Sequence, residues 1–109
     1  MIVLGIESTA HTFGVGITDG RTILSNRRDT YKPETGGIIP REAADHHYRL
    51  APDIIKSALD EAGIKLRDVD IFGFSQGPGI YAPLKVSFQI SRFLANKFRK
   101  KMIGVNHCI

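Results

Sequence analysis

Residues 1–18, MIVLGIESTAHTFGVGIT, contain two short apolar runs separated by a few small polar residues. Both runs are rich in β-branched side chains, which favour strands, and the connection between them is long enough only for a tight turn. The pair Asp19 and Gly20 is a hairpin-turn signal, and Ile23 and Leu24 begin another apolar run. The stretch therefore predicts three consecutive antiparallel strands.

A first helix is expected after the polar loop YKPETGG at residues 31–37. Pro40 suits the first turn of a helix, where its missing N–H costs nothing. The apolar residues that follow recur every three or four positions, as on one helical face, and Gly63 ends the pattern. Pro52 interrupts this pattern, so we expect it to kink or restart the helix.

The stretch LKVSFQI at residues 84–90 alternates like a strand, but its polar residues indicate a helix. They recur at spacings of 4, 3, 4 and 3, so on a helix they would form one polar stripe, which consists of Lys85, Gln89, Arg92, Asn96 and Arg99. On a helix the apolar residues then span roughly 200° of arc, more than the ~100° stripe that packing on one sheet requires. This helix is therefore predicted to need a second partner.

Two further core strands are expected, VDIFGFS at residues 69–75 and MIGV at residues 102–105. The predicted order is strand, strand, strand, helix, strand, helix, strand, which gives an α/β fold with a mixed five-stranded sheet and parallel later strands. That order is the one found in ribonuclease H-like cores. Residues 1–109 are expected to form one domain, since two lobes with a cleft between them need a longer chain.

Composition excludes some classes of protein. The start has no basic segment before its apolar run, no apolar run approaches the roughly 18 residues of a membrane span, and one cysteine cannot form an internal disulfide. A cytoplasmic protein without membrane contact is expected.

Charge is unevenly distributed along the chain. Residues 51–109 hold nine Lys and Arg against five Asp and Glu, and no acidic residue follows Asp70. Cations gather instead near the end of the second helix, at Arg92, Lys97, Arg99, Lys100 and Lys101. Three interpretations remain open, namely stabilisation of a helix C-terminus, a solvated face, and an anion-binding patch for nucleic acid.

Two connections have residues suited to binding phosphate. ESTAHT at residues 7–12 has small hydroxyl residues that leave backbone N–H groups accessible, although a plain tight turn fits equally well. SQGPG at residues 75–79 is a glycine-rich connection from strand to helix, and it lacks the Gly-Lys-Ser/Thr ending of a Walker A loop. Either connection is compatible with anion binding or with a simple turn.

Three histidines have competing interpretations. His107 follows a core strand and is either a structural residue or one ligand of a metal site. His46 and His47 are adjacent on a helix and point about 100° apart, so one is expected to pack and the other to be solvated. Cys108 is expected to fill a small apolar space.

Four motifs in order, LGIESTAHTFGVGI, GGIIPREAADHH, FSQGPG and GVNHCI, resemble the amino-terminal lobe of the Kae-type protein of the archaeal and eukaryotic KEOPS complex, the counterpart of bacterial TsaD. The resemblance covers the whole chain. It implies an actin-like ATPase lobe without the carboxy-terminal lobe. It also implies an enzyme that transfers threonylcarbamoyl from threonylcarbamoyl-AMP to the adenosine beside the tRNA anticodon, in which case the chain alone is expected to be inactive.

The resemblance also assigns site residues. Glu7, Ser8, Thr9 and His11 would line the nucleotide cleft, and His107 would be the first ligand of a His-x-x-x-His metal motif. The full-length family would hold one divalent metal, iron or zinc, and a nucleotide, threonylcarbamoyl-AMP or ATP. Neither is expected to bind tightly to this chain, and no catalytic base is identified.

Partners are implied in the same way. A small Pcc-type subunit would pack on the two helices, and a Bud-type kinase subunit and tRNA would complete the assembly. The helix residues expected at the interface are Ile54, Leu59, Val86, Ile90, Phe93 and Leu94. Residues 80–93 depart from the usual family pattern, so the alternative is a non-catalytic module that self-associates through the same helices. An actin-like kinase or ATPase lobe is a weaker possibility, because the phosphate-binding glycines and catalytic Asp are not found.

Overall fold

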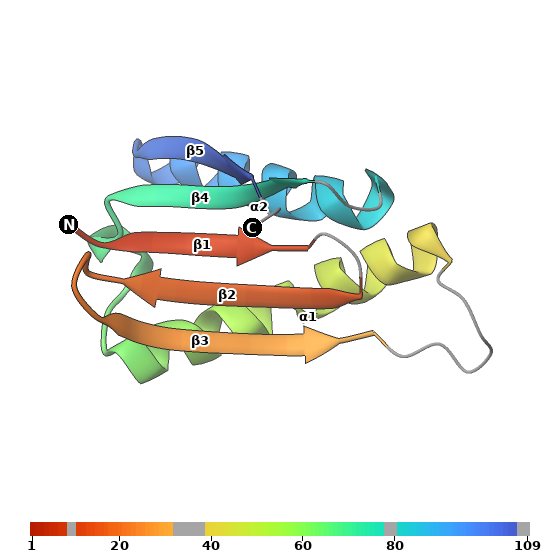
Figure 1. The fold of residues 1–109 in the computed structure, drawn as a ribbon. Helices are drawn as coiled ribbons and strands as arrows, with labels where there is room; N and C mark the ends of the chain where they lie inside the picture. The colour runs from red at the N-terminus through yellow and green to blue at the C-terminus, as the bar shows by residue number, and fades with distance from the viewer. Residues whose placement is uncertain (9–10, 32–38, 78–80, 107–109) are drawn as a thin grey trace.

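The computed structural model describes residues 1–8, 11–31, 39–77 and 81–106. In this part of the chain, five strands form one sheet in the order β3-β2-β1-β4-β5 (Figure 1). The strands are β1 (Val3–Glu7), β2 (Thr12–Thr18), β3 (Ile23–Thr30), β4 (Ile71–Gly77) and β5 (Lys101–Asn106). The predicted mixed sheet is confirmed.

The two halves of the sheet are built differently. β2 pairs antiparallel with both β1 and β3, as short connections allow, whereas β4 pairs parallel with both β1 and β5. A helix precedes β4 and another precedes β5, because a parallel strand must be reached by a crossover connection. The carboxyl ends of β1, β4 and β5 therefore meet at the same end of the sheet.

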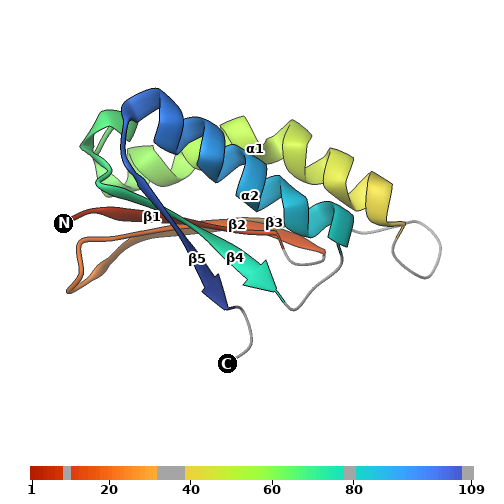
Figure 2. The ribbon, with the colours of Figure 1, turned by 90° about the horizontal axis from the view of Figure 1, so that it is seen from above.

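Both helices, α1 (Pro40–Ala62) and α2 (Tyr81–Phe98), cover one face of the sheet (Figure 2). Alternate residues of the strands point toward them, and Leu4, Phe13 and Phe72 are completely buried there. A 3₁₀ turn, η1 (Leu66–Asp68), leads from α1 to β4. None of the described helices combines the length and the apolar character that crossing a bilayer would need.

Pro52 lies inside α1, which continues through it as one helix of 23 residues. The expectation of a restart was wrong. Ala51 and Ile55, on either side of the proline, are both buried in the core, so tertiary packing holds the segment helical despite the lost hydrogen bond.

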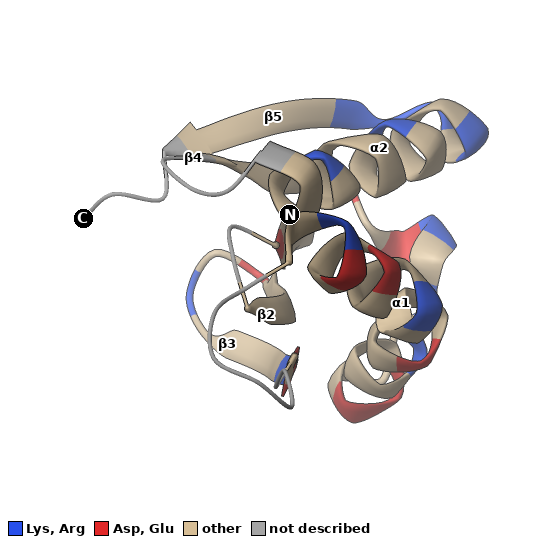
Figure 3. Ribbon diagram, turned by 90° about the vertical axis from the view of Figure 1, so that its right-hand side faces the viewer, with Lys and Arg blue, Asp and Glu red and all other residues tan. Residues whose placement is uncertain are grey.

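The two helices end with the same type of cap but with different residues. Gly63 has φ 72°, and Ile64 N–H donates to Leu59 C=O at 3.1 Å. After α2, Arg99 has φ 56°, and Lys100 N–H donates to Ala95 C=O at 2.8 Å. These are the bonds of a Schellman cap, for which glycine is preferred, so arginine at this position costs roughly 1 kcal/mol. Lys and Arg gather at this turn between α2 and β5 (Figure 3).

Among the described residues no helix covers the other face of the sheet. A row of glycines crosses its centre, because Gly16 and Gly73 are each paired with Gly5. Ile103 and Val105 are 42% and 52% exposed on the same side. The result is a shallow groove of about 440 Å³.

Candidate functional site

The candidate site lies where the parallel strands end. Glu7 is the last residue of β1, and Ser75 lies near the end of β4, which runs parallel to β1. In sheets with parallel strands, ligands bind outside the carboxyl ends of those strands. Both residues also line the groove on the uncovered face, together with Arg28 of β3. A carboxylate, a hydroxyl and a guanidinium therefore face a common opening.

Ser8 is used inside the fold. Its side chain is fully buried, and its Oγ accepts a hydrogen bond from the backbone N–H of Ser87 in α2 at 2.9 Å. Its own N–H donates to Ser75 Oγ at 3.4 Å. The Ser8 hydroxyl thus fixes α2 against the end of β1, and its contribution to the site is to position the turn that follows.

His11 lies at the start of the return strand and is exposed. Its backbone carbonyl accepts a hydrogen bond from Tyr31 N–H at 2.8 Å, which ties the start of β2 to the end of β3. Thr9 lies outside the described residues. Glu7 and His11 are consequently the two expected cleft residues whose side chains reach the surface in the described part.

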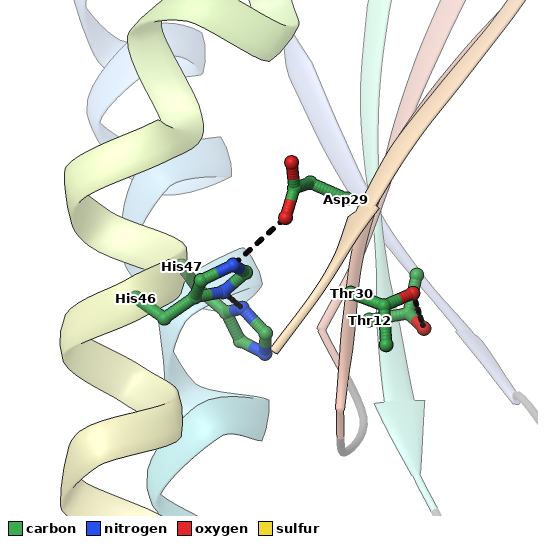
Figure 4. A network of polar contacts seen from close by, with 5 residues as sticks. All are labelled: Thr12, Asp29, Thr30, His46 and His47. Carbon is green, nitrogen blue, oxygen red and sulfur yellow. Dashed lines mark hydrogen bonds and ion pairs between the residues drawn. The ribbon is translucent and has the colours of Figure 1, made fainter. Parts of the chain in front are cut away.

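A partly buried polar cluster joins α1 to β3 beside this end of the sheet (Figure 4). His46 Nε2 lies 2.9 Å from Asp29 Oδ1, and the Nδ1 atoms of His46 and His47 are 2.9 Å apart. A carboxylate only accepts hydrogen bonds, so His46 Nε2 carries a proton. In neutral His46 the Nδ1 atom then accepts a hydrogen bond from His47.

The expectation that one of these histidines is solvated was wrong. His46 is 7% exposed and His47 is 0% exposed. His47 packs against Phe13 of β2 with ring centroids 5.8 Å apart, and His46 packs against Tyr31 at 5.7 Å. His46 and His47 are both buried because two neighbouring sides of α1 are covered, one by the sheet and the other by Tyr31.

Tyr31, which packs against His46, has a raised pKa. Loss of hydration raises the pKa of its phenol, and the nearby Glu42 carboxylate, which accepts its hydrogen bond at 3.4 Å, raises that pKa further. The phenol therefore stays protonated and acts as a hydrogen-bond donor to α1.

The residues expected at a partner interface fall into two groups. Leu59, Ile90 and Leu94 line an apolar groove of about 580 Å³ beside α1 and α2, and Phe93 is 63% exposed on α2. The remaining two do not line that groove: Ile54 is half-buried against the core, and Val86 is fully buried. Val86 was wrongly expected to face a partner, because it points at the sheet.

The described residues provide no metal site, since no three His, Cys, Asp or Glu side chains among them lie together. His107, the expected ligand, and Cys108 lie outside the described residues.

Sequence patterns gave no signal for the serine contacts. Ser8, Ser75 and Ser87 come from three separate elements, and a serine near the end of a strand is common in any turn. Asp29 would have been found only by pairing the polar inner positions of β3 with those of α1.

Comparison with known proteins gives a consistent result. The sequence model of one family, TsaD, described as tRNA N6-adenosine threonylcarbamoyltransferase, matches residues 22–109. Proteins of that name from Thermococcus kodakarensis and Caldivirga maquilingensis are 50% and 52% identical to this chain. The alignments cover 100% and 98% of the chain but 34% and 33% of those relatives, so the chain spans about a third of their length.

Solved structures support the fold. YeaZ from Pseudomonas aeruginosa matches with a TM-score of 0.77 at 18% identity, over 96% of this chain and 43% of that one. ROK hexokinase from Thermus thermophilus matches with a TM-score of 0.54 at 23% identity, over 97% and 34% of the two chains. Both neighbours have the actin-like ATPase fold, so that fold prediction is confirmed for this chain.

Proposed function

Since the chain belongs to the TsaD family of tRNA N6-adenosine threonylcarbamoyltransferases, we propose that it forms the amino-terminal lobe of such an enzyme. The observation that carries the proposal is the identity of about half of the residues over the entire chain with transferases of that name. The proposed substrates are threonylcarbamoyl-AMP and the adenosine beside the anticodon of a cytoplasmic tRNA.

The proposed reaction is an acyl-type transfer. The adenine N6 amine attacks the carbamoyl carbon, the new N–C bond forms, and the C–O bond to the phosphate breaks. AMP leaves with the electron pair of that bond, and the amine loses a proton to the medium. In this scheme the end of β1 and the start of β2 form one wall of the cleft, where Glu7 and His11 meet the nucleotide.

The metal belongs to the same proposal. His107 would supply one ligand to an iron or zinc ion, whose role when bound is to polarise the acyl adenylate. A single imidazole does not make a tight site, because structural and catalytic zinc sites use at least three protein ligands. The chain alone is therefore proposed to be inactive and to hold neither metal nor nucleotide tightly.

The helical face is proposed as a docking surface for a small Pcc-type subunit of KEOPS, whose assembly also contains a Bud-type kinase subunit. Support comes from the apolar groove at Leu59, Ile90 and Leu94 and from the exposed ring of Phe93. The second candidate function rests on this same groove: a non-catalytic module that dimerises through it.

A chimera tests the first candidate. This chain replaces the matching third of the Thermococcus kodakarensis relative, and threonylcarbamoyladenosine is measured in tRNA by mass spectrometry after reconstitution with the other subunits. We expect product from the chimera and none from the isolated chain. A folded, fully assembled chimera that makes no product would refute the enzymatic proposal, and a stable homodimer of the isolated chain would then favour the module.

A further inference from the structure

A cluster of cations occupies the corner where α2 turns into the edge strand β5. We call it the basic edge, and it consists of Arg92, Arg99, Lys100 and Lys101. Lys100 is half-buried and the other three are exposed. Within the described residues, β5 is paired on one side only, so no other strand there covers the corner. No acidic residue follows Asp70 in the sequence, and the charged residues coloured at this corner are Lys and Arg (Figure 3).

The basic edge is not neutralised within the described part of the chain. The ion pairs in this part of the chain join other residues, Arg27 with Glu61, His46 with Asp29 and Lys56 with Asp60. The two acidic residues that precede β4, Asp68 and Asp70, form hydrogen bonds with other parts of the chain.

Asp70 is held by the amino-terminal strand, because it accepts a hydrogen bond from Ile2 N–H at 2.7 Å. Asp68 accepts one from Lys65 N–H at 2.9 Å. In both of these bonds the carboxylate binds a backbone N–H group and not a cation of the basic edge. Within the described residues, the positive charge of the corner is therefore not balanced by a carboxylate.

Capping of the helix dipole explains only part of this cluster. A cation stabilises a helix C-terminus close to the last turn of the helix, where Lys97 lies, and Arg99 and Lys100 follow directly after the helix end at Phe98. Arg92 lies more than a turn before the end of α2, and Lys101 is already in β5. Lys97 also differs from the cluster, because its ammonium lies over the rings of Phe93 and Phe98 at 5.9 and 5.8 Å.

Backbone strain marks the same corner. Arg99 has φ 56°, a conformation in which the chain uses glycine at the matching position after α1. An unfavourable conformation kept by a charged residue points to a role for its side chain outside the fold. The strain and the uncompensated charge are independent observations about one site.

We propose that the basic edge binds the phosphodiester backbone of the RNA substrate. This inference rests on the proposed function, which makes RNA the substrate, and it adds a surface away from the cleft. Contacts of Lys and Arg to phosphates orient an RNA and carry no sequence information. The basic edge would therefore hold the body of the RNA while the target adenosine enters the site at the other end of the strands.

The test measures binding of an unmodified tRNA transcript by fluorescence anisotropy. For each phosphate contact, the logarithm of the binding constant falls by ~0.7–0.9 per unit of log salt concentration. At ~0.1 M salt, one contact therefore raises the binding constant about fivefold or more. Arg99→Gly is expected to weaken binding about fivefold and to raise the melting temperature, because glycine relieves the strain. Lost affinity in a more stable protein excludes unfolding as the explanation.

A double variant and a matched control complete the test. Lys100→Gln with Lys101→Gln lowers the formal net charge from +4 to +2 and is expected to weaken binding at least tenfold, with a smaller salt slope. Arg21→Gln with Lys56→Gln makes the same change in the turn between β2 and β3 and on α1, outside the basic edge, and is expected to leave affinity within about twofold.

Equal losses in both double variants would overturn the inference, since net charge alone would then explain binding. Unchanged affinity in Arg99→Gly and in the basic-edge double variant would also overturn it. Vesicles of phosphatidylserine that bind as tightly as tRNA and lose binding in the same variants would replace RNA by a membrane surface. The chimera assay does not depend on the basic-edge variants. If the chimera is active and the variants bind RNA as the parent does, only the RNA-binding role of the basic edge is refuted.

Discussion

Replacing His47 by Phe tests whether the histidine pair holds α1 on the sheet. The imidazole of His47 is 0% exposed, and it gives Nδ1 of His46 its hydrogen-bond partner at 2.9 Å. Phenylalanine preserves a planar ring beside Phe13 but has no nitrogen. The substitution therefore removes the polar contact with little change in the packed volume.

The magnitude follows from what is left behind. His46 stays 7% exposed with its Nδ1 unpaired, and a buried polar atom without a partner costs about 1–3 kcal/mol. For a domain of this size, about 2 kcal/mol lowers the melting temperature by roughly 8–16 °C. His47→Ala should cost more, about 3 kcal/mol or above, because it also leaves a cavity beside Phe13.

The assay is urea unfolding followed by circular dichroism, with His46→Phe and the His46→Phe, His47→Phe double variant measured in parallel. Because both single changes break one shared contact, the double variant should cost less than their sum by 0.5 kcal/mol or more, a coupling typical of residues in contact. Strict additivity, or a His47→Phe variant as stable as the parent, would refute the structural role of the pair.

Three further predictions concern other parts of the molecule. Asp19 accepts hydrogen bonds from the N–H groups of Arg21 and Thr22, both at 2.8 Å, and these bonds lower its pKa. A carboxylate whose pKa is lower in the folded state stabilises the fold above pH ~4, and this stabilisation is lost as the pH falls through the pKa of the folded state. Asp19→Asn should therefore lower the melting temperature at pH 7 but not at pH 2. Equal effects at the two pH values would contradict this prediction. Phe93→Asp should leave stability nearly unchanged and abolish binding of a Pcc-type subunit in calorimetry, since the ring is 63% exposed; undiminished affinity would remove the helical face from the interface. Titration of the isolated chain with zinc or iron(II) should show no tight stoichiometric binding, and a site of one metal per chain would contradict the role of His107 as a single ligand.

Local sequence patterns predicted the elements of the fold well and their limits less well. β3 was expected from Ile23 and Leu24, yet it runs on through polar residues to Thr30. The reason is that the inner face of this edge strand meets α1 through charged pairs, Arg27 with Glu61 and Asp29 with His46. Apolar periodicity detects burial against a core and does not detect a strand held by such contacts.

The candidate site was predictable only in outline. Alternation in β1 placed Glu7 at a strand end, and the structure agrees. The burial of Ser8 under Ser87 depends on contacts across 79 residues, which no local spacing reveals. The wide apolar arc of α2 predicts a second partner, and this stays a prediction. One of the residues assigned to that partner surface, Val86, is fully buried in the core.

Because β1 lies in the centre of the sheet, its two neighbouring strands are synthesised at different times. β1 is made before the other described strands and soon has β2 on one side. Its other side is filled by β4, and Ile2 bonds to Asp70 across 68 residues of chain. At ~5–20 residues per second a ribosome takes about 3–14 s to make that stretch. During this time the first strand presents an unpaired edge in the nascent chain. The early meander is therefore the stage at which this lobe is most exposed to mispairing, and a chaperone that shields a strand edge would act there.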